Sequence, residues 1–217
     1  MNAIAARQNF EIAREIFAAQ RMDLQKIRLT QSTLRMEQPL TANQNLYTFP
    51  VLVNIQNQAQ PFPTEIRLQQ QDSFVITEVG IFLALSTGTT DTTFQLKTYT
   101  NPFVFTNATQ MTSLYNNGVM KLMIDNDQWI NNWDLWRHWY SPETQATAAP
   151  GANSPIDQFM GADYGWYPMQ PFTFLTGAQN IELTIRLNNQ APTAVDANSR
   201  LIIMFRGVLA QNSTVIR

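Results

Sequence analysis

Three residues near the middle of the chain are of the types that form a hydrolytic triad: Asp134, His138 and Ser141. His138 is the only histidine, so a histidine acting as general base would have to be this residue. A working triad needs its base and its nucleophile on separate supports, whereas these three residues lie within one short stretch. No Gly-x-Ser-x-Gly elbow occurs in the sequence. We therefore interpret His138 as capping or packing among the neighbouring tryptophans, and we predict no catalytic residue and no enzyme.

The same region is rich in the oxygen ligands that a hard cation such as calcium needs. These residues are Asp125, Asp127, Asn131, Asn132 and Asp134. Their spacing does not fit an EF-hand loop, because glycine is missing at the sixth position and Trp136 stands where the bidentate glutamate belongs. Turn formation and helix capping account for the same residues. The sequence also has no cysteine and no glycine-rich phosphate loop, so we predict no metal and no cofactor.

Four of the five tryptophans lie close together after a short alternating segment, residues 119–124, that predicts a strand. Trp129, Trp133, Trp136 and Tyr140 are spaced 4, 3 and 4 apart, which predicts one face of a short helix after a turn at residues 125–127. An aromatic stripe at helical spacing is typical of a buried core. Exposed indole faces on a β-sandwich would instead stack sugar rings or bases, and this alternative stays open. The predicted aromatic knot consists of Trp129, Trp133, Trp136, Trp139 and Trp166.

Residues 3–27 contain neither glycine nor proline and are rich in helix-forming residues, so they predict a helix. Apolar residues form one strip of this helix, and arginines recur every seven residues along another side. We interpret it as a docking arm that lays its aromatic rings on a neighbouring subunit or membrane and turns its arginines toward phosphate or lipid headgroups. The alternative is a solvated helix whose arginines pair with nearby glutamates. The predicted assembly residues are Arg7, Phe10, Arg14, Phe17 and Arg21.

The composition indicates a surface that is polar but hardly charged. Charged residues make up 14% of the 217 residues, against the usual quarter or so, and lysine occurs only three times. Such a surface suits a subunit that is covered by copies of itself, although a neutral extracellular module would share it. A net charge of −2 excludes general electrostatic binding of nucleic acid, and only the arm favours phosphate. No apolar run is long enough to span a membrane, and the N-terminus has no continuous apolar signal core.

The rest of the chain reads mainly as strands. Residues 27–39 predict an extended connector or edge strand, and alternating or apolar runs follow at 46–55, 73–85, 93–99, 172–176, 181–187 and 199–210. We expect a bend at Gly80, a hairpin turn at residues 116–118, and a hairpin between the last two strands. With about eight to ten strands and no βαβ alternation, an all-β fold with a jelly-roll-type sandwich is predicted. Residues 1–38 would form the helical arm and connector, and residues 39–217 a single jelly-roll domain.

In layout the whole chain resembles the jelly-roll capsid proteins of icosahedral bacteriophages, with an amphipathic arm, an extended connector, an amide-rich β pattern and irregular loops. The resemblance implies a virion structural protein that is assembled in the host cytoplasm. Its partners would be copies of itself and other virion proteins, with the arm in contact with a neighbour, the genome or an internal membrane, and it would have no small-molecule substrate. The alternative is a receptor- or carbohydrate-binding β-sandwich that uses a tryptophan-rich surface.

Overall fold

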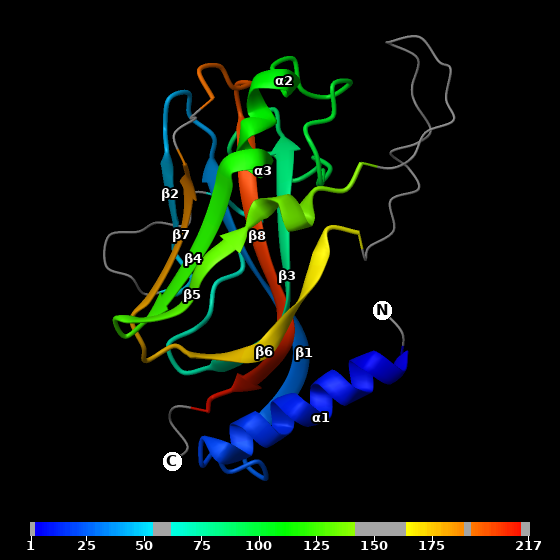
Figure 1. Cartoon of the computed structure of the whole chain (residues 1–217). Helices are drawn as coiled ribbons and strands as arrows, with labels where there is room; N and C mark the ends of the chain where they lie inside the picture. Colours follow the sequence, from blue (N-terminus) through cyan, green and yellow to red (C-terminus); the bar gives the residue numbers. More distant parts are fainter. Residues whose placement is uncertain (1–2, 54–61, 142–163, 189–191, 214–217) are drawn as a thin grey trace.

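In the part of the chain that the structure describes, eight strands form two antiparallel sheets that face each other (Figure 1). The computed structural model describes residues 3–53, 62–141, 164–188 and 192–213. In spatial order, the first sheet contains β1 (Arg28–Pro39), β8 (Ser199–Gln211), β3 (Ser73–Leu85) and β6 (Trp166–Thr176). The second sheet contains β2 (Leu46–Phe49), β7 (Ile181–Leu187), β4 (Gly118–Ile124) and β5 (Asp127–Asp134). The predicted all-β sandwich is confirmed.

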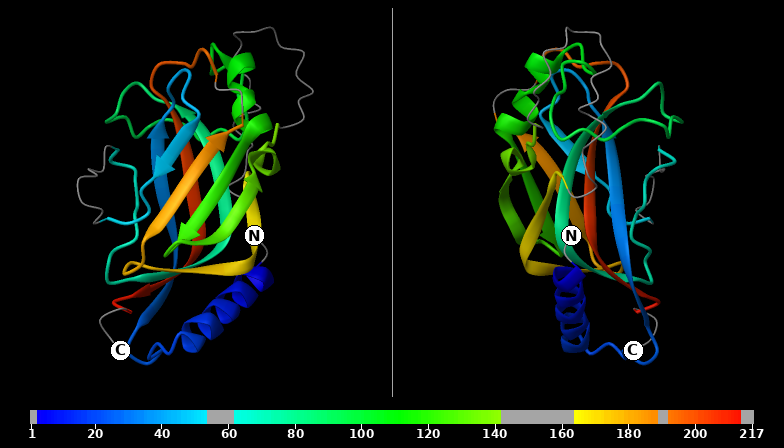
Figure 2. Two further views of the ribbon diagram at one scale, coloured as in Figure 1. Left: turned by 60° about the vertical axis from the view of Figure 1, so that its left-hand side comes forward. Right: turned by 90° about the vertical axis from the view of Figure 1, so that its right-hand side faces the viewer.

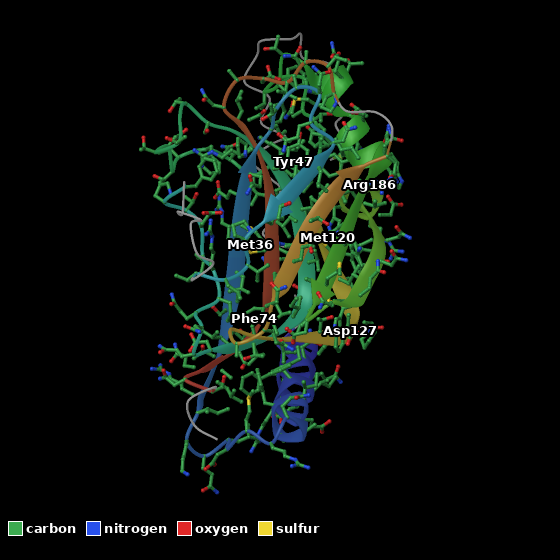
Figure 3. The ribbon with its side chains drawn as sticks, turned by 90° about the vertical axis from the view of Figure 1, so that its left-hand side faces the viewer. Met36, Tyr47, Phe74, Met120, Asp127 and Arg186 are labelled. Carbon is green, nitrogen blue, oxygen red and sulfur yellow. The ribbon has the colours of Figure 1, made fainter. Side chains whose placement is uncertain are left out.

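The main core lies between the two sheets, where alternate side chains of each strand meet. Met36 and Phe74 come from the first sheet and Tyr47 and Met120 from the second, and all four are buried (Figure 3). Strand β7 shows the period of two most clearly, because its four alternate apolar residues are all buried, as predicted: Ile181, Leu183, Ile185 and Leu187. The alternating pattern therefore identifies the inward faces of β4 and β7 correctly.

The first sheet is covered on both faces, which explains why β3 and β8 are apolar along nearly their whole length. Their inward residues join the main core, and their outward residues form two smaller clusters. One cluster contains Val75 and Val208, and the other contains Phe82 and Ile202. β8 is central in this sheet, between β1 and β3, as its continuous apolar run indicates. The expected hairpin between β7 and β8 is wrong, because β7 pairs with β2 and β4 in the other sheet.

Helix α1 (Ala3–Ala19) lies across one end of the sandwich, opposite the end that carries the short helices α2 (Ala108–Met111) and α3 (Ser113–Asn117) (Figures 1 and 2). It is shorter than the predicted helix over residues 3–27. Arg21 adopts a left-handed conformation with φ of 60°, and the Arg21 and Met22 amides bond back to the Ala18 and Phe17 carbonyls. This pattern is a Schellman motif, which ends a helix after its last regular turn.

The helix expected over residues 129–140 is also wrong, because these residues form strand β5 and then the short 3₁₀ helix η1 (Leu135–His138). The predicted turn is present, but its central residues, Asp125 and Asn126, both have positive φ, at 51° and 70°. Two such residues form a type I′ turn, whose twist matches that of a β-hairpin. The chain therefore returns beside β4 as a strand. Trp129 and Trp133 lie on that strand, Trp136 on η1 and Trp139 just after it, so they do not share one helical stripe.

Several smaller expectations are corrected in the same way. Of the two readings of residues 27–39, the edge strand is confirmed: β1 pairs with β8 from Arg28 to Pro39 at the edge of the first sheet, so the sandwich includes residues placed in the connector. Residues 93–99 form no strand; only Lys97 bridges to β3. Helix α3 occupies the position of the hairpin turn expected before β4. The bend expected at Gly80 lies elsewhere, because the pairing of β3 is irregular between Ile76 and Glu78. Gly80 instead makes room for the rings of Phe82 and Trp166, which a Cβ atom at this position would contact. Residues 54–55 of the predicted strand over residues 46–55 lie outside the described residues.

Candidate binding and assembly surfaces

His138 lies buried beneath the aromatic residues that follow β5. The indole Nε1 of Trp133 donates a hydrogen bond to His138 Nε2 at 2.8 Å, and His138 Nδ1 lies 2.9 Å from the Gly165 carbonyl oxygen. Because Nε2 accepts, Nδ1 must carry the hydrogen and donate to Gly165, so the ring is neutral. Burial lowers the pKa of His138 to about 4, and the positive charge of Arg137 also lowers it. The predicted packing of this histidine among tryptophans is confirmed.

The three triad candidates do not assemble into a catalytic unit. Asp134 accepts a hydrogen bond from the Trp136 backbone amide at 3.0 Å and thereby caps η1. Both ring nitrogens of His138 are already bonded to other groups. In the oxygen-rich region, the carboxylate of Asp125 accepts from the Asn180 amide at 2.8 Å. Within the described residues, no group of three or more His, Cys, Asp or Glu side chains is placed to hold a metal ion. Turn formation and capping account for Asp125 and Asp134.

A set of seven aromatic residues lies along one side of the sandwich, on β5, η1 and β6 and on the residues next to η1 and β6, and we call it the aromatic surface. Its members are Trp129, Trp133, Trp136, Trp139, Tyr140, Tyr164 and Tyr167. The rings of Trp133 and Tyr167 meet edge to face, with centroids 5.5 Å apart. The guanidinium carbon of Arg137 lies 5.2 Å and 5.3 Å from these two ring centroids. Since β5 and β6 are edge strands of different sheets, this contact joins the two sheets.

Two of the tryptophans predicted to be core residues are largely exposed: Trp129 at 53% and Trp136 at 52%. For Trp129, the reason is the irregular pairing of β5 with β4. Ile130 pairs with Leu122 and Gln128 with Met123, which leaves Trp129 as an extra residue in a bulge on an edge strand. Trp133 and Trp139 are half-buried and pack against the main core. The predicted aromatic knot is therefore partly a surface.

Trp166 does not belong to this surface, although the sequence grouped it with the other tryptophans. Its ring packs edge-on against Phe82 at 5.6 Å on the outer face of the first sheet. The guanidinium carbon of Arg206 lies 3.8 Å from its centroid. Its neighbour Tyr167 points to the other side of β6 and contacts Trp133 instead. The alternation of β6 explains the separation, because successive residues of a strand face opposite ways.

Trp136 rests on a fixed support. Its ring lies nearly parallel to that of Trp139, with an interplanar angle of 20° and centroids 5.6 Å apart. Trp139 packs edge-on against Tyr115 at 5.2 Å and against Tyr99 at 6.2 Å. One face of Trp136 is thus covered by an anchored ring, and its exposed area belongs to the opposite face. Tyr140 and Tyr164 form a second stacked pair at 4.5 Å.

The predicted assembly residues of the arm fall into two groups. Phe17 is buried against the outer face of the first sheet, where it meets Phe174 edge-on at 6.1 Å, and Phe10 packs beside it. These aromatic rings are therefore used within the chain and not presented to a neighbour. Arg7, Arg14 and Arg21 are exposed. Arg14 lies 3.8 Å from Glu11, which is the pairing that the solvated-helix alternative predicted.

A buried charged cluster, which the sequence reasoning missed, lies on the outer face of the first sheet. Glu37 is fully buried and binds Arg200 at 3.0 Å, Arg35 at 2.8 Å and the Thr64 hydroxyl. Its backbone amide donates to Glu65, whose pKa is raised by burial. The signal was present in β1, because Arg35 and Glu37 alternate with the inward Leu34 and Met36. The cluster fastens the segment around residues 62–68 to the sheet.

Comparison of the chain with protein-family models, curated proteins and solved structures gave no match. No helix in the described part of the chain is long and apolar enough to cross a membrane. The interpretation of function therefore rests on the geometry of the chain itself.

Proposed function

We propose that the sandwich is a jelly roll and that the protein is a structural subunit of a virion, a capsid protein that assembles with copies of itself and with other virion proteins. The observation that carries the proposal is the nested order of strand pairs. β1 pairs with β8, β2 with β7, β3 with β6 and β4 with β5, and every pair is antiparallel. This order is what results when one long hairpin is folded into two four-stranded sheets, as in jelly rolls.

Jelly rolls occur in viral capsids, in lectins and in cupins, so further features must favour one of these classes. A cupin-type metal site inside the sandwich receives no support, because the described residues between the sheets are mainly apolar and the single histidine lies under the aromatic surface. The sparse charge of the whole chain favours a subunit whose surface is covered by neighbours. These two features favour a shell protein.

Helix α1 supplies a candidate contact with other virion components. Its apolar side is held by the chain's own sheet, and its two arginines, Arg7 and Arg14, face solvent, as does Arg21 just after the helix. Exposed guanidinium groups bind phosphate or carboxylate in a bidentate manner. We propose that Arg7, Arg14 and Arg21 contact an acidic neighbour, the genome or the headgroups of an internal membrane.

Size-exclusion chromatography with multi-angle light scattering, followed by electron microscopy, tests the proposal. Across a concentration series and in shell-promoting salt, the full chain should form capsomers or closed shells. Replacing Arg7, Arg14 and Arg21 together by glutamine should weaken assembly, whereas Arg186→Gln, on the exposed side of β7, should leave it unchanged. A particle that stays monomeric at every concentration and salt condition would refute the shell function.

A further inference from the structure

The exposed aromatic rings have no role in the proposed assembly, and they differ from ordinary surface residues in how firmly they are held. Trp133 is fixed by its bond to His138 and by the guanidinium of Arg137, and Asp134 caps the turn that carries Trp136. Trp136 itself is stacked on an anchored neighbour. A ligand that stacks on these rings would therefore meet a platform that is already ordered, and binding would cost little conformational entropy.

From this geometry we propose that the aromatic surface is a carbohydrate-binding site, with the free face of Trp136 as its main stacking platform and Trp129 as a second. A pyranose ring presents a face of C–H groups, which packs flat against an indole. The ring of Trp139 stacks on one face of Trp136, and Trp136 is still largely exposed. Its other face can therefore receive a flat partner. The proposal goes beyond assembly and does not depend on it.

The polar groups beside the rings suit hydroxyl groups better than ions. Gln128, Asn131 and Asn132 are exposed on β5 next to Trp129. Their amide groups can donate and accept hydrogen bonds, as sugar hydroxyls require, and they carry no charge. Near Trp136, the charged side chains are already engaged, since Asp134 caps η1 and Arg137 lies over two rings, and the exposed charge on β5 beside Trp129 is the carboxylate of Asp127, which would repel an anionic sugar. We therefore expect a neutral glycan rather than a sulfated or sialylated one.

The pairing of β5 disfavours a second copy of the chain as the occupant of this side. β5 is an edge strand, and a neighbouring copy would most simply add a strand to it. Its pairing with β4 is irregular between Met120 and Leu122 and again between Leu122 and Met123. Bulges of this kind twist an edge and interrupt the row of backbone groups that a further strand would need.

The test uses the full chain on an array of neutral, sialylated and sulfated glycans, followed by titration with the best neutral oligosaccharide, observed by tryptophan fluorescence and calorimetry. Trp136→Ala should lower the affinity roughly 10- to 100-fold, in the range known for loss of a stacking ring. Trp136→Phe should retain most of the binding, because it keeps a flat ring. The matched control is Phe103→Ala, which removes a 56% exposed ring from a different loop. Thermal melts identify any variant that fails to fold, in which case Trp136→Phe and Trp129→Ala decide.

Three results would overturn the proposal. They are the absence of glycan binding by the unaltered chain, binding that survives both Trp136→Ala and Trp129→Ala, and a change of oligomeric size in Trp136→Ala without a change in glycan binding. The last result would identify a protein-docking surface. Assembly is measured separately, so shells that bind no glycan would refute this inference alone, and a monomer that binds glycan would refute the shell function alone.

Discussion

Replacing Arg200 by methionine removes one charge from the buried cluster on the first sheet. The guanidinium is buried together with Glu37, 3.0 Å away, and it also donates to the Gly88 carbonyl. Its central carbon lies 4.3 Å and 4.6 Å from the ring centroids of Phe62 and Phe94. Methionine fills a similar volume without the charge, so the change mainly tests electrostatics and hydrogen bonding.

Breaking a buried ion pair by removal of one partner typically costs 3–5 kcal/mol, since it leaves the other charge unpaired in a poorly solvated place. Glu37 keeps a second cation, Arg35 at 2.8 Å, and the Thr64 hydroxyl, so the cost should fall at the lower end of that range. We expect Arg200→Met to lower the free energy of unfolding by about 3 kcal/mol. Adding Glu37→Gln should recover part of that loss, because a neutral amide does not need the cation, giving a coupling of roughly 1–3 kcal/mol.

Urea unfolding at pH 7, followed by circular dichroism and tryptophan fluorescence, measures all four members of this cycle. Arg186→Met is the matched control, because Arg186 is exposed on β7 and its loss should change stability by no more than about 0.5 kcal/mol. A loss below 1 kcal/mol for Arg200→Met, or strict additivity with Glu37→Gln, would refute the view that the cluster acts as one buried network.

Three further predictions concern single residues. Because the pKa of His138 falls from 6.5 to about 4 on folding, its contribution to stability is complete above pH 6.5 and declines as the pH falls toward 4. Denaturant titrations should show that the free energy of unfolding of the unaltered chain falls by roughly 2.5 kcal/mol more than that of His138→Gln between pH 7.5 and 4.5. The same pH dependence of stability in both proteins would contradict this. Phe17→Ala should cost about 3–5 kcal/mol in urea unfolding, whereas the exposed Ile12→Ala should cost little; equal small effects would show that α1 is not docked on its own sheet. Gly207→Ala should lower the melting temperature strongly, since its Cβ would lie 1.8 Å from the Val75 carbonyl oxygen, whereas Gly88→Ala meets nothing within 4 Å and should not; similar melts would contradict the close approach of β8 to β3.

Local patterns in the sequence were enough to identify most strands. The period of two in β4 and β7 assigned their inward faces correctly, because side-chain direction along a strand depends only on position. The long apolar runs identified β3 and β8 as strands, and the structure shows that both of their faces are covered. The role of His138 also followed from its aromatic neighbours alone.

The spacing of the tryptophans was compatible with two local structures, and the turn before them decided between these. Spacings of 4 and 3 suit a helix, but they also arise on an edge strand that contains bulges. The positive φ of Asp125 and Asn126 turned the chain back beside β4, where Trp129 lies exposed on the edge strand. No local pattern predicts that this segment is a strand, because that depends on its pairing with β4.

The remaining features were decided by segments far apart in the sequence. Phe17 meets Phe174 only because β6 and β8 present an uncovered apolar face to the end of α1. Glu37 meets Arg200 because β1 and β8 pair in one particular register. The sequence by itself determined which residues alternate, which turn and which carry charge. Only the tertiary structure decided which apolar faces and which charges meet, because strand pairing depends on the combined burial of all eight strands and not on any one of them.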